Sequence, residues 1–202
     1  MGAHRGNYAD AHLKNYDKLV LVEPCKDLAE FLRQKYRDEP KVVVVEKVVS
    51  DEKKVRFYVC NVDTISTAAD AWVHRSRFSD KGFEWTPKDD LPTITLDQLI
   101  AQHGMPSKTK VDVEGYESHV IKSLSRYVGA LSFEWAEEVR DDIVACLYHL
   151  TRIGYSKFHI QNGDRYDFIP NQNEYHNIDK TIAALNRWIP TRRDSWGMIH
   201  CL

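Results

Sequence analysis

The sequence predicts an α/β fold with a mainly parallel sheet and an antiparallel strand at its C-terminal end. Apolar runs rich in β-branched residues alternate with amphipathic stretches, the pattern of strands and helices in turn. The run at residues 18–24 is continuously apolar until it ends in an acid, as strands buried on both faces are. No repeat, linker or low-complexity segment divides the 202 residues, so we expect one domain spanning residues 1–202.

Each expected element follows from its own periodicity. The predicted helices carry one apolar face, and Gly104 and Gly154 end two of them. These helices cover residues 7–16, 25–37, 95–103, 115–127 and 137–153. The predicted strands are residues 18–24, 42–49, 55–60, 109–113, 130–135, 156–161, 166–169 and 195–202.

Residues 61–93 lack a sustained period and mix polar, aromatic and small side chains. A stretch of this length is more often a functional loop than a neutral connector, so we expect a lid or substrate loop. Its aromatic and basic side chains suit stacking on a sugar or another small polar ring. The alternative is a lid that packs on its own aromatic side chains. The side chains concerned are Trp72, His74, Arg75, Arg77, Phe78, Phe83 and Trp85.

Charge and composition exclude several classes of protein. With 28 basic and 30 acidic residues the formal net charge is -2, so we expect no nucleic-acid partner and no membrane partner. No apolar run reaches the roughly 20 residues that span a bilayer, and we expect no secretory signal. The cysteines lie far apart, so we interpret them as reduced thiols of a cytoplasmic protein and assign no metal ligand. They are Cys25, Cys60, Cys146 and Cys201.

The stretch MGAHRGNY contains a glycine turn of the kind that joins a strand to a helix. Gly2 and Gly6 indicate a close approach of the backbone, although the same spacing occurs in ordinary tight turns. His4 stands where a dinucleotide-binding fingerprint needs its middle glycine, which disfavours pyrophosphate binding. Only Met1 precedes the turn in this sequence, so no strand is predicted before it.

Three acids, Glu23, Asp112 and Glu134, lie at the carboxyl ends of predicted strands. Ligands of open parallel sheets bind in the crevice outside these ends. Glu23 follows the glycine turn at an offset that suits hydrogen bonds to both hydroxyls of a ribose; the alternative is that it caps the next helix. Asp112 would be costly to bury without a partner, whereas Glu114 suits the N-terminus of the following helix.

The segments GAHRGNY, LVEP, VVSD, TITLDQLI, KVDVEGYE and LSFEW, in this order and spacing, resemble the FkbM family of methyltransferases. The resemblance covers nearly the whole chain, and TLDQLI followed by KVDVEGYE is its most specific part. It implies a class I enzyme that uses S-adenosylmethionine on a Rossmann-like α/β sandwich. The family's first strand and the acid before its glycine are missing, so the first strand is expected to be truncated.

The resemblance also implies a cofactor site. The glycine turn would lie beside the methionine part of the cofactor, with His4 in place of the family's usual asparagine. Glu23 would hold the ribose hydroxyls, and Ser50 with Asp51 would lie near the adenine. Asp112 would face the sulfonium and the methyl acceptor. The implied cofactor-binding residues are Gly2, Ala3, His4, Gly6, Asn7, Glu23, Pro24, Ser50, Asp51 and Asp112.

Carboxylates at a water-poor sheet edge suit a cationic sulfonium, and methyl transfer mainly requires alignment of the reacting atoms. A hydroxyl acceptor also needs a base that takes its proton. The candidate catalytic residues are Asp112, Glu114 and Glu134, with His119 and His74 behind them. We therefore expect O-methylation of a hydroxyl on a sugar or another small metabolite.

Two other functions remain open. One is a nicotinamide-dependent reductase, which the missing middle glycine disfavours. The other is a catalytically silent binding protein that kept the fold but lost a working cofactor site. Loss of a central strand would expose unpaired backbone groups on its neighbours. We therefore expect either that the natural chain starts earlier or that another segment, such as SWGMIHCL, fills the gap.

Overall fold

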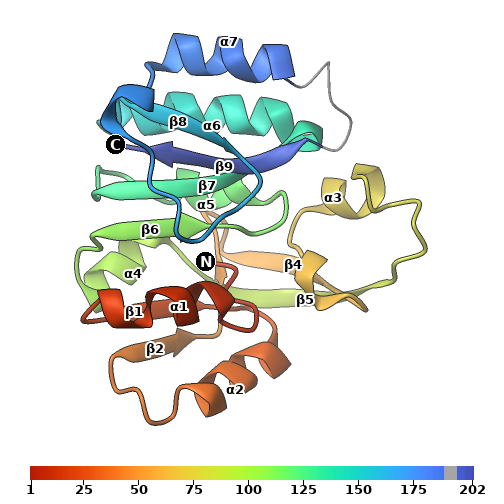
Figure 1. Ribbon diagram of the computed structural model, residues 1–202. Helices are drawn as coiled ribbons and strands as arrows, with labels where there is room; N and C mark the ends of the chain where they lie inside the picture. The colour runs from red at the N-terminus through yellow and green to blue at the C-terminus, as the bar shows by residue number, and fades with distance from the viewer. Residues whose placement is uncertain (189–194) are drawn as a thin grey trace.

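The computed structural model describes residues 1–188 and 195–202, which form a stack of strands with helices packed around it (Figure 1). The α-helices are α1 (Asn7–His12), α2 (Lys26–Lys35), α3 (Asp70–Arg75), α4 (Leu96–His103), α5 (Glu117–Lys122), α6 (Arg140–Arg152) and α7 (Ile178–Trp188). Single 3-10 turns are η1 (Leu13–Asn15), η2 (Asp63–Ile65), η3 (Glu137–Val139) and η4 (Gln172–Glu174). The strands are β1 (Leu19–Val22), β2 (Val42–Val45), β3 (Val48–Val49), β4 (Lys54–Cys60), β5 (Trp85–Ile94), β6 (Lys108–Val111), β7 (Ala130–Ala136), β8 (Phe158–Asn162) and β9 (Trp196–Cys201).

The strands form mixed sheets in the orders β1-β2, β3-β5-β4 and β6-β7-β9-β8. Parallel ladders join β1 to β2, β3 to β5 and β6 to β7. Antiparallel ladders join β4 to β5, β7 to β9 and β8 to β9. The α/β class and the antiparallel C-terminal strand are confirmed, and the arrangement is consistent with a Rossmann-like fold. The expected predominance of parallel strands is wrong, because both β4 and the returning β9 run against their neighbours.

Two groups of buried apolar side chains support the sheets. The larger one surrounds β6 and β7 and includes Val111, Val120 and Phe133, which have no exposed surface. The smaller one lies between α1, α2 and β1 and is made of Ala9, Leu21, Leu32 and Tyr36. β1 separates them, because alternate side chains of a strand point to opposite faces.

Several predicted elements differ from the observed ones. The strand expected at residues 42–49 is divided into β2 and β3 at the charged pair Glu46 and Lys47. The strand expected at 166–169 is a turn, in which the Phe168 N–H donates to the Arg165 carbonyl (3.1 Å). The helix expected at 115–127 is reduced to α5. The helix α7 was not predicted.

Residues 61–93 are not irregular throughout, since they contain η2, α3 and most of β5. Pro87 and Pro92 argue against a strand in the sequence. Within the described part of the chain, however, residues 85–92 of β5 pair with β4 alone, and Thr93 and Ile94 pair with β3. The other edge of residues 85–92 is therefore open, where a residue without an N–H is tolerated.

The terminal stretch SWGMIHCL does not fill the gap of the missing strand. It supplies β9, which lies between β7 and β8. Among the described strands β1 pairs with β2 alone and β6 with β7 alone, and Figure 1 shows the start of the chain between β1 and β6. None of the helices within residues 1–188 and 195–202 combines the length and apolar character needed to cross a membrane.

Candidate functional site

A pocket of about 350 Å³ opens at the carboxyl ends of β1 and β6, beside the middle of β7. It collects residues from the start of the chain, from the 61–68 segment and from the loop after β8. Of the residues predicted for the cofactor and for catalysis, those that line it are Gly2, Ala3, His4, Asn7, Glu23, Pro24, Asp112, Glu114 and Glu134. Residues distant in sequence therefore meet at the sheet edge, where the strand-end acids predicted a ligand site.

The glycine turn is held to both neighbouring strands. Gly2 has a φ of 70°, and a Cβ built on it would lie 1.7 Å from the Asp112 carbonyl oxygen, so only glycine fits. The Ala3 N–H donates to the Val22 carbonyl (3.2 Å), and the His4 N–H donates to Glu23 (2.8 Å). The turn thus brings backbone from the start of the chain against both β1 and the loop after β6.

Glu23 is almost fully buried and binds backbone through both carboxylate oxygens. Its Oε2 accepts the His4 N–H, and its Oε1 accepts the Cys25 N–H at 3.0 Å. Burial raises the pKa of Glu23, against the effect of these two hydrogen bonds. Each carboxylate oxygen can accept a second hydrogen bond. Glu23 can therefore cap the start of the next helix and bind a ligand at the same time.

Gly6 lies behind the turn and outside the pocket lining. Its φ is 81°, its carbonyl accepts the Tyr36 hydroxyl (2.9 Å), and a Cβ on it would lie 2.4 Å from that hydroxyl oxygen. Gly6 therefore packs α1 against α2. Gly6 is predicted to bind the cofactor, but it does not line the pocket.

Asp112 follows β6 directly and forms an ion pair with Lys110, with 2.6 Å between Oδ2 and Nζ. Lys110 also pairs with Asp164, from the loop after β8, at 3.0 Å. Burial opposes the charge of Lys110, but the two carboxylates outweigh it and raise its pKa. Its ammonium lies 5.3 Å from the centre of the Tyr8 ring and 5.6 Å from that of Tyr166. These contacts supply the partner that a buried Asp112 was expected to need.

The carboxylates of Asp112, Glu114 and Glu134 come together in the pocket, with one oxygen of each within 4.8 Å of the others. Glu134 is 6% exposed, and its Oε2 has no hydrogen-bond partner among the residues that the structure describes. Burial and the neighbouring carboxylates raise the pKa of Glu114 and of Glu134 well above the usual value. The cluster can hold a positive charge, either a cationic organic ligand or a divalent metal ion, although no metal ligand is predicted from the sequence.

Glu114 adopts a backbone conformation that favours glycine, with a φ of 56°. Its carbonyl accepts the hydroxyl of the buried Thr67 (2.7 Å), which fixes this turn from the 61–93 segment. Gly115 follows with a φ of 88°, where a Cβ would lie 2.7 Å from the Trp72 ring. The strained turn after β6 is thus held in place by the 61–93 segment, for which the sequence predicts a loop.

Ser50 and Asp51 do not line the pocket. The Ser50 hydroxyl is fully buried and hydrogen-bonds the Tyr116 hydroxyl (2.9 Å), and Asp51 pairs with His119 (2.9 Å). Val48, Val49 and Tyr116 itself form that side of the pocket. The short strand β3 turns the serine inward, so Ser50 supports the pocket wall through Tyr116 instead of facing a ligand.

The two histidines considered as reserve bases also lie outside the pocket. His119 stacks on the Tyr116 ring with 4.3 Å between ring centres. His74 is exposed at the end of α3, 3.7 Å from Asp70. The carboxylates are therefore the basic side chains best placed among the predicted ones.

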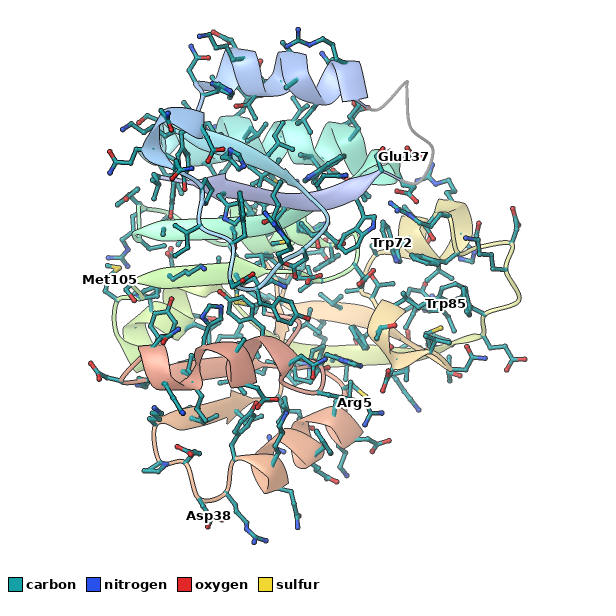
Figure 2. All side chains as sticks on the ribbon, viewed as in Figure 1. Arg5, Asp38, Trp72, Trp85, Met105 and Glu137 are labelled. Carbon is teal, nitrogen blue, oxygen red and sulfur yellow. The ribbon has the colours of Figure 1, made fainter. Side chains whose placement is uncertain are left out.

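The aromatic side chains of the 61–93 segment pack on one another. Trp72, Phe78, Phe83 and Trp85 form a chain of ring contacts with 5.9–6.1 Å between successive centres. Figure 2 shows Trp72 and Trp85 in the part of the molecule formed by α3, β4 and β5. None of these rings lines the pocket, to which the segment contributes smaller side chains. The aromatic side chains of this segment therefore pack on one another, as the alternative expected. The pocket lining gives no support for their stacking on a sugar.

Some pocket residues were not predicted from sequence. They are Tyr8, Asp63, Thr64, Lys110, Asp164 and Tyr166. Asp63 binds His4 (2.9 Å) and Arg5 (2.6 Å), and so ties the glycine turn to η2. Only Lys110 carried a local signal, because it lies two residues before Asp112 on a predicted strand and shares its face. Asp164 and Tyr166 reach the site only through the tertiary fold.

No family model matches the chain, and no curated protein matches it either.

We expect stability to depend on the protonation of Glu117, a fully buried acid on α5. Burial raises the pKa of Glu117 from 4.5 to about 7, against the hydrogen bond it accepts from the Val113 N–H. Below pH 4.5 both the folded and the unfolded chain hold this proton, so its stabilising effect is complete. As pH rises to about 7, the unfolded chain releases the proton first, and the unfolding free energy falls by up to about 3 kcal/mol.

Urea unfolding at pH 5 and pH 7 measures this effect. Glu117→Gln keeps an acceptor for Val113 and should lose less stability than the parent over this interval. Glu30→Gln, at an exposed position of α2, should behave as the parent does. Equal losses in the parent and in Glu117→Gln would contradict the assignment.

The 61–93 segment is anchored by a nearly buried ion pair. Arg77 donates to Glu138 from its backbone N–H (3.0 Å), its Nε (2.7 Å) and its Nη2 (2.7 Å), and the two side chains are 10% and 12% exposed. Burial would raise the pKa of Glu138, but the hydrogen bonds from Arg77 hold it below its usual value.

Arg77→Met should therefore lower the unfolding free energy by about 3 kcal/mol, because Glu138 keeps its buried charge and loses its counter-charge. Denaturant unfolding measures the change. Arg75→Met, at an exposed position of α3, should stay within about 0.5 kcal/mol of the parent. Equal stabilities of the two variants would show that the ion pair does not anchor the segment.

Proposed function

We propose that this protein is an S-adenosylmethionine-dependent methyltransferase that methylates a hydroxyl on a sugar or another small metabolite. The observation that carries the proposal is the pocket itself, in which a glycine turn faces three clustered carboxylates, two from the loop after β6 and one from within β7. A sulfonium and an ammonium group are positively charged, and this arrangement offers them negative charge in a partly buried site. The resemblance to the FkbM family in the same segments adds to this argument.

The residues present fit such a ligand. The unpartnered Glu134 Oε2 is a buried acceptor that a cationic group would satisfy. Gly2 and Ala3 leave room for a ligand beside their backbone, and Glu23 keeps acceptor sites for two ribose hydroxyls. His4 differs from the family's asparagine, yet its ring binds Asp63 and the turn is kept.

S-adenosylmethionine supplies the electrophilic methyl group when it is bound. The protein aligns the acceptor hydroxyl with it, and a carboxylate takes the hydroxyl proton as the new C–O bond forms. The pKa values of Glu114 and Glu134 are raised, which brings these two acids toward the range in which a general base works at neutral pH. Asp112 already forms an ion pair with Lys110 and is better suited to face the sulfonium.

A second candidate function is a binding protein without catalytic activity. It is favoured by a groove between β1 and β6, the two strands that carry Glu23 and Asp112 at their ends. A site that borders an open groove holds a ligand less rigidly, and weak alignment reduces methyl transfer more than it reduces binding. A nicotinamide-dependent reductase has no comparable support, since this chain lacks the middle glycine of the dinucleotide-binding fingerprint.

Calorimetric titration with S-adenosylmethionine and with NADH separates these functions. Binding of S-adenosylmethionine alone is the expected result, followed by methyl transfer to a hydroxyl compound in an acceptor screen. Binding without transfer to any acceptor would favour the silent binding protein. Binding of NADH alone, or of neither ligand, would contradict the proposal.

A further inference from the structure

The fold holds the carboxylates of Asp112, Glu114 and Glu134 together without supplying enough positive charge to balance them. One oxygen of each lies within 4.8 Å of the others. Among the described residues Lys110 forms an ion pair with Asp112, and neither Glu114 nor Glu134 forms one. Lys110 also pairs with Asp164, so its single charge is already shared. The cluster therefore keeps an excess of negative charge.

Glu134 is the member of the cluster whose burial most needs a partner. It lies inside β7, between the fully buried Phe133 and Trp135, and β7 itself lies between β6 and β9. The Glu134 side chain is 94% buried and lines the pocket, and no described residue hydrogen-bonds its Oε2. A buried carboxylate without a partner is costly. This unsatisfied oxygen is an observation separate from the clustering, and it also points to a bound cation.

The backbone fixes the positions of the other two acids before any ligand binds. The Thr67 hydroxyl donates to the Glu114 carbonyl (2.7 Å) and so holds the turn in which Glu114 has a φ of 56°. The Asp112 side chain is held by Lys110 through Oδ2 at 2.6 Å, which leaves its other oxygen available. A site that is already built loses less free energy to ordering when a ligand binds.

The donor atoms and their spacing suit a divalent cation. Carboxylate oxygens are typical ligands of Mg²⁺, Mn²⁺ and Ca²⁺. These ions hold oxygens at about 2–2.6 Å, so the oxygens around one ion lie within about 4–5 Å of one another. The spacing in the cluster, 4.8 Å or less, allows the three carboxylates to close on a single ion. They would fill about half of a six-coordinate shell, and the pocket leaves room there for water or for oxygens of a ligand.

We propose that Asp112, Glu114 and Glu134 bind one divalent cation of the Mg²⁺, Mn²⁺ or Ca²⁺ type. The ion would supply the missing positive charge and satisfy the unpartnered oxygen of Glu134. The site goes beyond the proposed function, because it does not depend on methyl transfer. In a methyltransferase the open positions of the ion would bind the hydroxyl oxygen of the acceptor, and that consequence alone rests on the proposed function.

Titration of the purified protein with Mn²⁺, without S-adenosylmethionine, tests the proposal. Electron paramagnetic resonance measures free Mn²⁺, whose sharp signal is lost on binding. We expect the parent protein to bind one Mn²⁺ per chain and to release it to excess Mg²⁺ or Ca²⁺. Bound Mn²⁺ should also raise the thermal midpoint of unfolding, because the unfolded chain has no preformed site.

Glu134→Gln should weaken Mn²⁺ binding by about 100-fold or more, since even the loss of a group that only orients a metal ligand costs about 10- to 100-fold. The substitution removes a buried unpaired charge, so without metal the variant should unfold at no lower temperature than the parent. Asp164→Asn is the matched control, because Asp164 lines the same pocket but lies outside the cluster. It should lose clearly less Mn²⁺ affinity.

Three results would overturn the proposal. The first is a free Mn²⁺ signal that the parent protein leaves unchanged. The second is equal binding by the parent and Glu134→Gln, which would place the ion on other acids. The third is an equal loss in Asp164→Asn and Glu134→Gln, which would show a response to the general charge of the pocket. A protein that bound Mn²⁺ as expected but did not bind S-adenosylmethionine would support this inference and contradict only the methyltransferase proposal.

Discussion

Asp112→Asn should weaken the binding of S-adenosylmethionine by about 30- to 100-fold, which corresponds to the about 2–3 kcal/mol of a hydrogen bond to a charged group. The substitution keeps the size of the side chain but removes the negative charge that is proposed to face the sulfonium. It also leaves Lys110 buried with Asp164 as its remaining counter-charge, so the unfolding free energy should fall by about 3 kcal/mol. Calorimetry measures the first effect and urea unfolding the second.

Asp164→Asn is the matched control. Asp164 pairs with the same ammonium at 3.0 Å, has a side chain 12% exposed and lines the same pocket, but it lies outside the cluster of three carboxylates. We expect a similar loss of stability and a clearly smaller loss of binding. If both variants bound the ligand as the parent does, Asp112 would be a structural partner of Lys110 and nothing more.

Gly2→Ala should have the second large effect, because the new Cβ would lie 1.7 Å from the Asp112 carbonyl oxygen. The close atom belongs to the backbone, which cannot shift without a large cost in free energy. Either the glycine turn or the loop after β6 must therefore move. We expect a loss of unfolding free energy of about 3 kcal/mol, together with loss of S-adenosylmethionine binding. Thermal unfolding and calorimetry measure the two effects.

Gly82→Ala is the control for Gly2→Ala. It has the cost of placing alanine at a positive φ but not the clash of the new Cβ with a neighbouring atom. Gly82 has a φ of 73°, close to that of Gly2, but a Cβ added to it would have no atom within 4 Å. It should therefore lose only about 1 kcal/mol and keep full binding. A Gly2→Ala protein that matched Gly82→Ala in both measurements would show that the close approach to Asp112 is not needed.

The elements predicted correctly are those with a strong local pattern. β1 is an uninterrupted apolar run, and β7 is mostly apolar. α4 begins at a capping box of Thr95 and Gln98 and ends at Gly104, which has a φ of 95°. β5 was missed because its prolines are acceptable only on an open edge. That edge exists only once β3, β4 and β5 have assembled.

The candidate site was predicted in part, for a physical reason. Glu23 and Asp112 could be located because parallel strands bring their carboxyl ends to one edge. Ser50 was misplaced because its orientation depends on the two-residue strand β3 and on a hydrogen bond to Tyr116, a residue distant in sequence. Asp164 and Tyr166 were missed because no periodicity marks a loop residue that reaches the site across the fold.

The proposal that S-adenosylmethionine binds beside the carboxylate cluster is tested most directly by the NMR signal of its ¹³C-labelled sulfonium methyl group. With the protein in excess, we expect one shifted methyl signal that returns to the free position on adding S-adenosylhomocysteine. With Asp112→Asn, a higher protein concentration should be needed for the same shift. A methyl signal that stays at its free position in the presence of the folded parent protein would contradict the proposal.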